Sequence, residues 1–152
     1  MILGISTTKS AVIIAETRGA GAKFGITAIR PIPFQVGTGA DLAKLRQSLL
    51  TLFARPGRFA GAVIALLKCS SGRFSSGLEA IKGEAITELV AAQCHLLVVK
   101  VAPQSLKKTL GCAPDQKWRD RAAERFNPAG TQRNWSKGAA GAVAVAFKVA
   151  GG

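Results

Sequence analysis

The stretch 62–101 constrains the fold most strongly, because it contains a strand, a loop, a helix and a second strand in succession. Its ends, 63–68 and 96–101, are short apolar runs typical of buried strands. A strand, helix and strand of this length form a right-handed crossover between parallel strands, and functional groups then gather at the carboxyl end of the first strand. We therefore expect the site of this protein near residues 67–69.

The helix of this stretch is predicted from spacing alone. Apolar residues recur at intervals of three and four over 78–92, which indicates one buried face. The expected buried face consists of Leu78, Ile81, Ala85, Leu89 and Ala92, widened by Ile86 and Val90.

Three further strands are predicted before this stretch, at 1–6, 10–17 and 26–34. The polar link between the first two is short enough for a hairpin. Pro31 and Pro33 cannot donate to a ladder, so the third strand belongs at an edge. These runs predict an antiparallel meander that leads into the parallel pair.

Helices complete the element order. Asp41 is a candidate N-cap for a helix to residue 53, and Ser136 is a candidate N-cap for an Ala-rich helix to residue 149. Shorter helices are expected at 102–111, with Pro103 at its start and Gly111 as its stop, and at 115–126. The order β-β-β-α-β-α-β followed by helices is that of the ribonuclease H-like fold. We expect one domain over 1–152, with a five-stranded mixed sheet and helices on both faces.

The charge of the chain points to a polyanionic partner. There are 21 Lys and Arg residues against 8 Asp and Glu residues, giving a net charge of +13. The excess is spread along the chain, so it is not a basic tail. Such an excess favours nucleic acid over a membrane surface as the partner.

Cysteine usage and the apolar runs bear on the compartment. Cys69, Cys94 and Cys112 are far apart and odd in number, which favours reduced thiols and a cytoplasmic protein. The first five residues are too short an apolar run for a signal peptide. The run 138–149 falls short of the roughly 20 residues that span a bilayer, so we expect no membrane segment.

The stretch 63–111 resembles Holliday-junction resolvases of the RuvC type. The resemblance rests on a strand, a Gly/Ser loop, a helix with a small residue midway, a second strand and a helix that opens with Ser105, Leu106, Lys107 and Lys108. The opening 1–10 and the Ala-rich run 138–146 resemble the first strand and last helix of that family. The chain is also similar to a small bacterial family of RuvC-like proteins of unassigned function. That similarity rests on Lys68, Gly72, Arg73, Phe74, Gly77 and the run 82–86.

The resemblance implies an active site that this chain lacks. Resolvases of this fold hold two divalent metal ions with four carboxylates, from the first strand, the fourth strand and twice from the last helix. The matching positions here are Ser6, one residue within 65–68 for which we take Lys68, Gly138 and Gly141. None is acidic, and Mg²⁺ requires oxygen anions. The resemblance therefore implies a catalytically inactive protein with no metal and no cofactor.

The same positions predict a basic cleft that binds nucleic acid, DNA junctions or duplexes rather than RNA. The candidate contacts are cations, which pair with phosphates, and one tryptophan, which could stack on bases. They are Lys9, Lys68, Arg73, Lys82, Lys107, Lys108, Lys117, Arg121, Arg125, Arg133, Trp135 and Lys137. Trp118 has helical spacing to Phe126 and is expected in the core.

Two alternatives stay open at this point. The chain could be an interaction or structural module whose charge serves another protein, or a metal-dependent nuclease whose acidic residues have been displaced. Related resolvases pair through the helix that corresponds to 78–92, so the resemblance also implies a homodimer through that helix.

Overall fold

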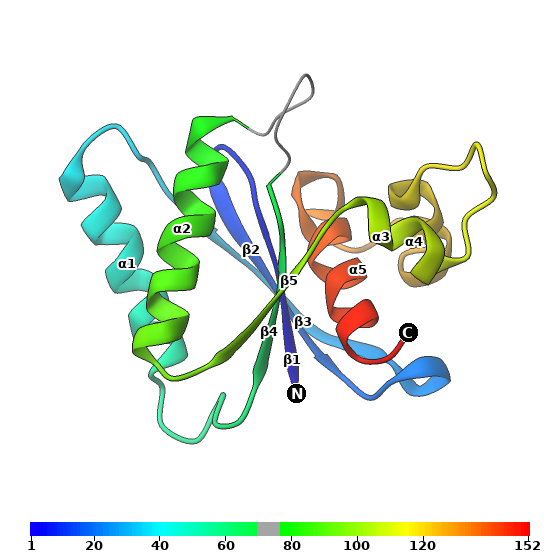
Figure 1. Cartoon of the computed structure of the whole chain (residues 1–152), viewed down its shortest axis with the longest axis horizontal. Helices are drawn as coiled ribbons and strands as arrows, with labels where there is room; N and C mark the ends of the chain where they lie inside the picture. The colour runs from blue at the N-terminus through cyan, green and yellow to red at the C-terminus, as the bar shows by residue number, and fades with distance from the viewer. Residues whose placement is uncertain (70–76) are drawn as a thin grey trace.

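A five-stranded mixed sheet lies at the centre of the protein, whose computed structural model describes residues 1–69 and 77–152 (Figure 1). The strands are β1 (Ile2–Thr7), β2 (Ala11–Arg18), β3 (Gly25–Pro33), β4 (Val63–Leu67) and β5 (Leu97–Val101). They are ordered β3-β2-β1-β4-β5, with β1 antiparallel to β2, β2 antiparallel to β3, and β1, β4 and β5 parallel. This topology confirms the predicted ribonuclease H-like plan, with the proline-containing β3 at an edge.

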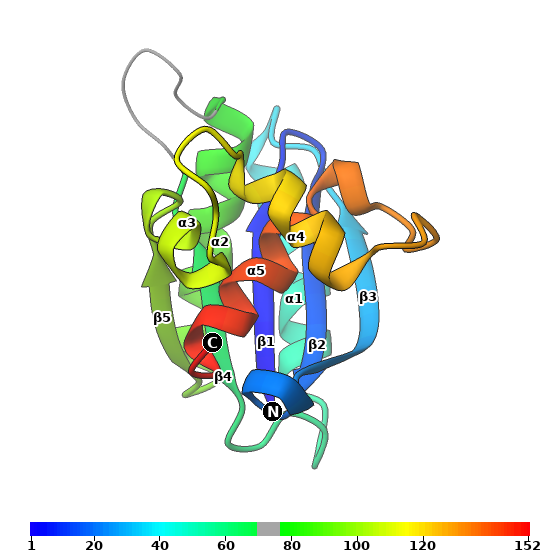
Figure 2. The ribbon, with the colours of Figure 1, turned by 90° about the vertical axis from the view of Figure 1, so that its right-hand side faces the viewer.

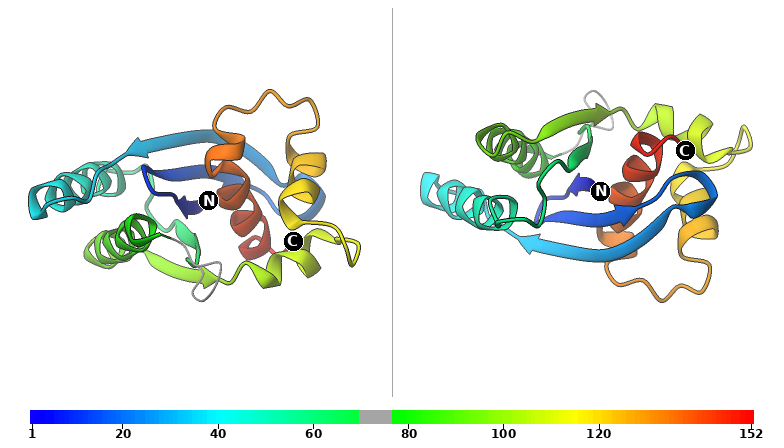
Figure 3. Two further views of the ribbon diagram at one scale, coloured as in Figure 1. Left: turned by 90° about the horizontal axis from the view of Figure 1, so that it is seen from above. Right: turned by 90° about the horizontal axis from the view of Figure 1, so that it is seen from below.

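Helices cover both faces of the sheet, as Figure 3 shows from above and from below. On one face lie α1 (Gly39–Phe53) and α2 (Leu78–Gln93), which pack against each other. On the other face α5 (Ala139–Val149) crosses β1, β2 and β4. Outside α5 lie α3 (Gln104–Leu110) and α4 (Trp118–Phe126) (Figure 2). The three-layer arrangement is therefore confirmed.

Helix α5 is enclosed by the sheet and by α4. Every residue from 139 to 147 is buried, which explains why the helix is apolar on all sides. Its backbone approaches β1 so closely that a Cβ atom at Gly4 would overlap the carbonyl oxygen of Ala142. None of the helices within the described residues is long and apolar enough to cross a membrane.

The predicted buried face of α2 is wrong at its five main positions, whereas Val90 is buried and Ile86 packs against the core, as predicted. Leu78, Ile81 and Leu89 are 63%, 44% and 45% exposed. The face that lies on the sheet and α1 is built mainly from small residues, and Gly83 is so close to Phe34 that a Cβ atom there would lie 2.9 Å from its ring. Small side chains allow the helix to approach its neighbours, so the largest apolar side chains point to solvent.

Strand β5 also differs from its predicted buried environment, because it is the second edge of the sheet. Leu97 is 64% exposed and Val99 is 37% exposed. The crossover rule gives the order of the strands correctly, but it does not say how far α3 and α5 extend over the last one.

Three helix starts differ from the predicted ones. Thr38 is the N-cap of α1, and Asp41 is its reciprocal partner in a capping box: the Thr38 hydroxyl accepts from the Asp41 N–H at 3.2 Å, and the Asp41 carboxylate accepts from the Thr38 N–H at 3.1 Å. Ser136 lies in a 3₁₀ turn (Trp135–Lys137), and Gly138 occupies the N-cap of α5. Helix α4 begins at Trp118, three residues later than predicted.

Candidate nucleic-acid interface

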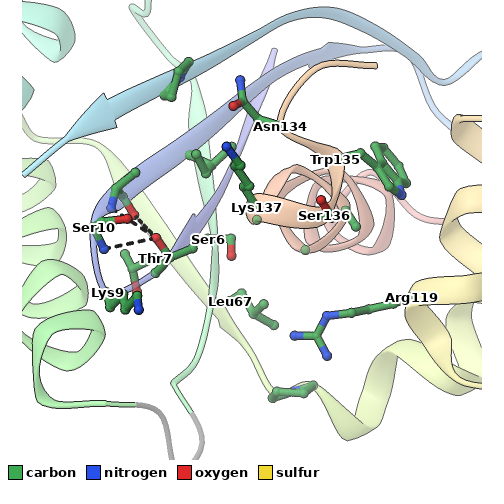
Figure 4. A pocket seen from close by; sticks show the side chains of 18 of the residues that line it. Ser6, Thr7, Lys9, Ser10, Leu67, Arg119, Asn134, Trp135, Ser136 and Lys137 are labelled. Atoms are coloured by element: carbon green, nitrogen blue, oxygen red, sulfur yellow. Dashed lines mark hydrogen bonds between the residues drawn. The ribbon is translucent and has the colours of Figure 1, made fainter. Parts of the chain in front are cut away.

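A cleft of about 810 Å³ opens where β1 and β4 end (Figure 4). One wall is the turn between β1 and β2, residues 7–10, and the opposite wall is the start of α4 with Pro103. Residues 134–141, which lead into α5, close a third side. The cleft lies at the carboxyl end of the first strand of the crossover, which is where ligands bind in open α/β sheets.

The four positions at which the resemblance implied carboxylates meet in this cleft. Ser6, Lys68, Gly138 and Gly141 all line it. A Cβ atom at Gly141 would lie 3.1 Å from Ser6 Oγ and 2.9 Å from Leu67 Cδ2. Of the residues within 65–68, Leu67 thus contacts the start of α5, while Lys68 is exposed beyond the strand.

The side chains of the cleft do not fit a divalent metal ion. The residues that meet at its floor offer a hydroxyl, an apolar side chain and two glycines where hard cations need carboxylates. Gly138 has φ +121°, a conformation that other residues rarely adopt. Within residues 1–69 and 77–152 no group of three or more His, Cys, Asp or Glu side chains is placed to hold a metal.

Positive charge replaces the missing acids. The described lining includes four cations, Lys9, Lys68, Arg119 and Lys137, and one acid, Asp120. They come from four different segments of the chain, and a concave surface focuses their field. Figure 4 shows the Arg119 guanidinium directed from α4 toward Leu67. The cleft is therefore suited to an anion.

Arg119 is the cation that sequence reasoning missed. The pattern of 115–126 indicated a basic face at Lys117, Arg121 and Arg125, but the face that lines the cleft carries Arg119, Asp120 and Ala123. The Arg119 guanidinium lies 4.4 Å above the ring of Trp118, whose side chain is buried as predicted. The position of Arg119 beside the predicted core residue Trp118 was the one available signal.

Several predicted contacts lie outside the cleft, and some of them have partners within the protein. Lys82 Nζ donates to the Val36 carbonyl at 3.5 Å, and Lys107 Nζ donates to the Pro114 carbonyl at 3.3 Å. Arg121 donates to the Leu110 carbonyl and to Glu124. Arg125 lies 4.3 Å from the centre of the Phe147 ring.

The remaining candidates divide into two groups. Lys108, Lys117 and Arg133 are exposed and do not line the cleft. Trp135 does line it, but it also packs against the apolar residues around α5. Arg73 lies outside the described residues. The contacts to nucleic acid at all these positions stay predictions.

A charged network holds one side of the cleft in place. The buried Glu84 carboxylate of α2 accepts from the Cys69 N–H at 2.7 Å and from Lys100 Nζ at 2.9 Å. Lys100 also pairs with Glu88 at 3.0 Å, and Thr7 Oγ1 donates to the Ala80 carbonyl at 2.9 Å. Burial acts to raise the pKa of Glu84, but the hydrogen bonds from Cys69 and Lys100 outweigh it, so this pKa lies below its ordinary value. Hydrogen bonds to both glutamates raise the pKa of Lys100.

Glu84→Gln is expected to destabilise the protein by about 2 kcal/mol near pH 7, because it removes charge-assisted hydrogen bonds from a buried group. A carboxyl whose pKa is lowered by folding contributes stability above its unfolded pKa and loses that contribution as the pH falls through its folded pKa. The difference between wild type and variant should therefore shrink as the pH falls below the ordinary pKa of a glutamate, as measured by urea unfolding at a series of pH values. Glu79→Gln, at an exposed site on the same helix, is the control. Differences that do not change with pH would contradict this role of Glu84.

The arrangement of strands, helices and cleft defines the fold class, which is the RuvC/ribonuclease H-like fold. In particular, the chain is similar to a structure of RuvC from Thermus thermophilus, with TM-score 0.70 and 14% identity over 97% of this chain and 94% of that one. It is also similar to T. thermophilus RuvC in complex with a Holliday junction substrate, with TM-score 0.70 and 12% identity over 96% and 89% of the two chains. No protein-family profile and no curated protein matches the sequence. At such identities the likeness shows the fold.

Proposed function

We propose that this protein is a catalytically inactive relative of the RuvC resolvases that binds nucleic acid, DNA in preference to RNA, through the cleft described above. The observation that supports the proposal most strongly is the positive charge of the cleft. Four cations and one acid surround its floor, which is formed by Ser6, Leu67 and Gly141. Cations that converge on a concave surface bind phosphates of any sequence. The RuvC complex with a Holliday junction substrate favours DNA, branched or duplex, as the ligand.

The lack of carboxylates at the cleft floor supports the other part of the proposal, that the protein is catalytically inactive. A two-metal nuclease needs carboxylates that clamp both the attacking and the leaving oxygen. Glu84 is held by Cys69 and Lys100, and Glu16 is held by Arg30 and Arg58, so both of these buried carboxylates already have cationic partners. Asp120 faces the cleft without a second acid among the described lining residues.

A cleavage assay tests whether the protein lacks nuclease activity. Labelled four-way junction, duplex and single-stranded DNA are incubated with the purified protein and either Mg²⁺ or Mn²⁺. We expect the DNA to be bound and to remain intact. A specific cut that disappears in an Asp120→Asn variant would show instead an active nuclease with a displaced acid.

We also propose that the protein pairs with a second copy through α2. Leu78, Ile81 and Leu89 form an exposed apolar stripe beside the β5 edge, where Leu97 and Val99 are exposed as well. Two chains of charge +13 repel each other, and α2 is the helix with the largest excess of acids, Glu79, Glu84 and Glu88 against Lys82. It is therefore a face on which two copies can meet with little repulsion.

Leu89→Glu is expected to convert the dimer to a monomer, because it buries two carboxylates across the two-fold axis. The measurement is sedimentation velocity over a range of protein concentrations. Thr51→Glu, at an exposed position of α1, is the matched control and should leave the dimer intact. A wild-type protein that stays monomeric at the highest attainable concentration would contradict the pairing.

A further inference from the structure

Ser6 is a largely buried residue whose hydroxyl opens into the cleft and has no hydrogen-bond partner among the described residues. Its side chain lies on the face of β1 toward α5, and the residue is only 6% exposed. The hydrogen bonds of residues 1–69 and 77–152 include none to Ser6 Oγ, whereas Thr7 and Thr8 both use their hydroxyls within the protein. Figure 4 shows the Ser6 oxygen in the open space between Leu67 and Lys137. No buried side-chain nitrogen or oxygen of the described residues lacks a hydrogen-bond partner, so the Ser6 oxygen is open to the cleft, where it can donate to a ligand atom.

The first turn of α5 lies directly against this hydroxyl. Ala140 and Gly141 line the cleft, and a Cβ atom at Gly141 would be 3.1 Å from Ser6 Oγ. At this end of the helix, Ala139 N–H donates to Asn134 and Ala142 N–H donates to Gly138. The amides of Ala140 and Gly141 have no such partner within the described chain. Free amides and the positive end of an 11-residue helix favour an anion at the same point as the Ser6 hydroxyl.

The charge and size of the cleft indicate which anion. The four cations and one acid of the described lining give the cleft a net charge of +3. This charge is larger than the single negative charge of a phosphodiester within a strand. A phosphomonoester carries about −1.5 to −2 near pH 7 and offers three acceptor oxygens. The volume of about 810 Å³ is sufficient for the end of a strand, one or two nucleotides long.

We propose that the floor of the cleft binds the terminal phosphate of a nucleic-acid strand. One phosphate oxygen accepts from Ser6 Oγ and another from the amides at the start of α5. Lys9, Lys68, Arg119 and Lys137 supply the surrounding charge, against which Asp120 acts weakly. The proposal rests on the proposed function and adds that the protein recognises a strand end instead of an uninterrupted backbone.

The test compares strands that differ only at one end. Single-stranded DNA of one sequence, labelled at the opposite end, carries either a phosphate or a hydroxyl at its 5′ end, and a second pair differs in the same way at its 3′ end. Fluorescence anisotropy gives the affinities. We expect the phosphate to strengthen binding at least about tenfold in one of the two pairs, in line with a set of charge-assisted hydrogen bonds.

Two variants assign that preference to the cleft floor. Ser6→Ala should reduce the ratio of the two affinities to nearly one, because it removes the hydroxyl that meets the phosphate. Ser48→Ala, on the exposed side of α1, should leave the ratio unchanged. A Ser6→Ala protein that keeps the full preference would overturn the assignment.

The remaining outcomes separate this proposal from the proposed function. Equal affinity for phosphate and hydroxyl at both ends would overturn strand-end recognition while leaving nucleic-acid binding in place. Inorganic phosphate and a mononucleotide serve as competitors, and displacement of the strand at equal concentrations would show that the ligand is a free phosphomonoester. Failure of all four strands to bind would overturn the proposed function itself.

Discussion

Replacing Lys9, Arg119 and Lys137 together by methionine is expected to weaken DNA binding by about 100-fold at low salt. Each cation that neutralises a phosphate releases condensed counterions, so the slope of log affinity against log salt should fall by about 2 to 3. Methionine keeps much of the length of these side chains and removes only the charge. The three residues come from the β1–β2 turn, α4 and the turn before α5, so they sample three sides of the cleft.

A matched triple variant separates the effect of the cleft cations from the effect of the total positive charge of the protein. Lys23, Lys44 and Arg55 are exposed and do not line the cleft. Replacing them by methionine lowers the net charge from +13 by 3, to +10, as the cleft variant does. This control should lose less than about threefold in affinity, since exposed charges beyond a Debye length are screened. Equal losses in the two triples would show that binding depends on total charge and not on the cleft.

Gly4→Val is expected to abolish the fold or to destabilise it by more than about 3 kcal/mol, beyond the usual range for overpacking. A side chain at Gly4 would overlap the Ala142 carbonyl and lie 2.8 Å from Ala146 Cβ, so α5 would have to move away from β1. That helix supplies buried residues to both apolar clusters on its side of the sheet. Far-UV circular dichroism and urea unfolding measure the effect.

The control for this variant is another strand glycine with free space around it. Gly25 begins β3, and a Cβ atom there would have no atom within 4 Å. Gly25→Ala should change the free energy of unfolding by less than about 0.5 kcal/mol, as surface substitutions usually do. If Gly4→Val unfolds at the same urea concentration as Gly25→Ala, the close approach of α5 to β1 is wrong.

The order of the strands could be predicted from the sequence because it follows from local patterns and one general rule. Alternating and apolar runs give β1 to β5, and the right-handed crossover fixes their neighbours. The exposure of α2 could not be predicted, because the helical period of its large apolar residues is equally compatible with a core face and a partner face. Only the packing of Gly83 against Phe34 decides between them.

The candidate site could also be predicted only in part. Ser6, Gly138 and Gly141 could be brought together because a resemblance to a known site supplied their positions, and the structure places them in one cleft. Arg119 could not be found, since the start and rotation of α4 depend on how Trp118 and Ala122 pack. For the same reason Arg121 and Arg125 were predicted as contacts, although both have partners inside the protein.

The most direct test of the cationic cleft is the affinity of the wild-type protein for junction, duplex and single-stranded DNA, measured as a function of salt. We expect binding at low ionic strength that weakens steeply as salt is added, and a smaller salt dependence in the cleft triple variant than in its matched control. Absence of binding at low ionic strength, or slopes that are identical in the two triples, would contradict this expectation.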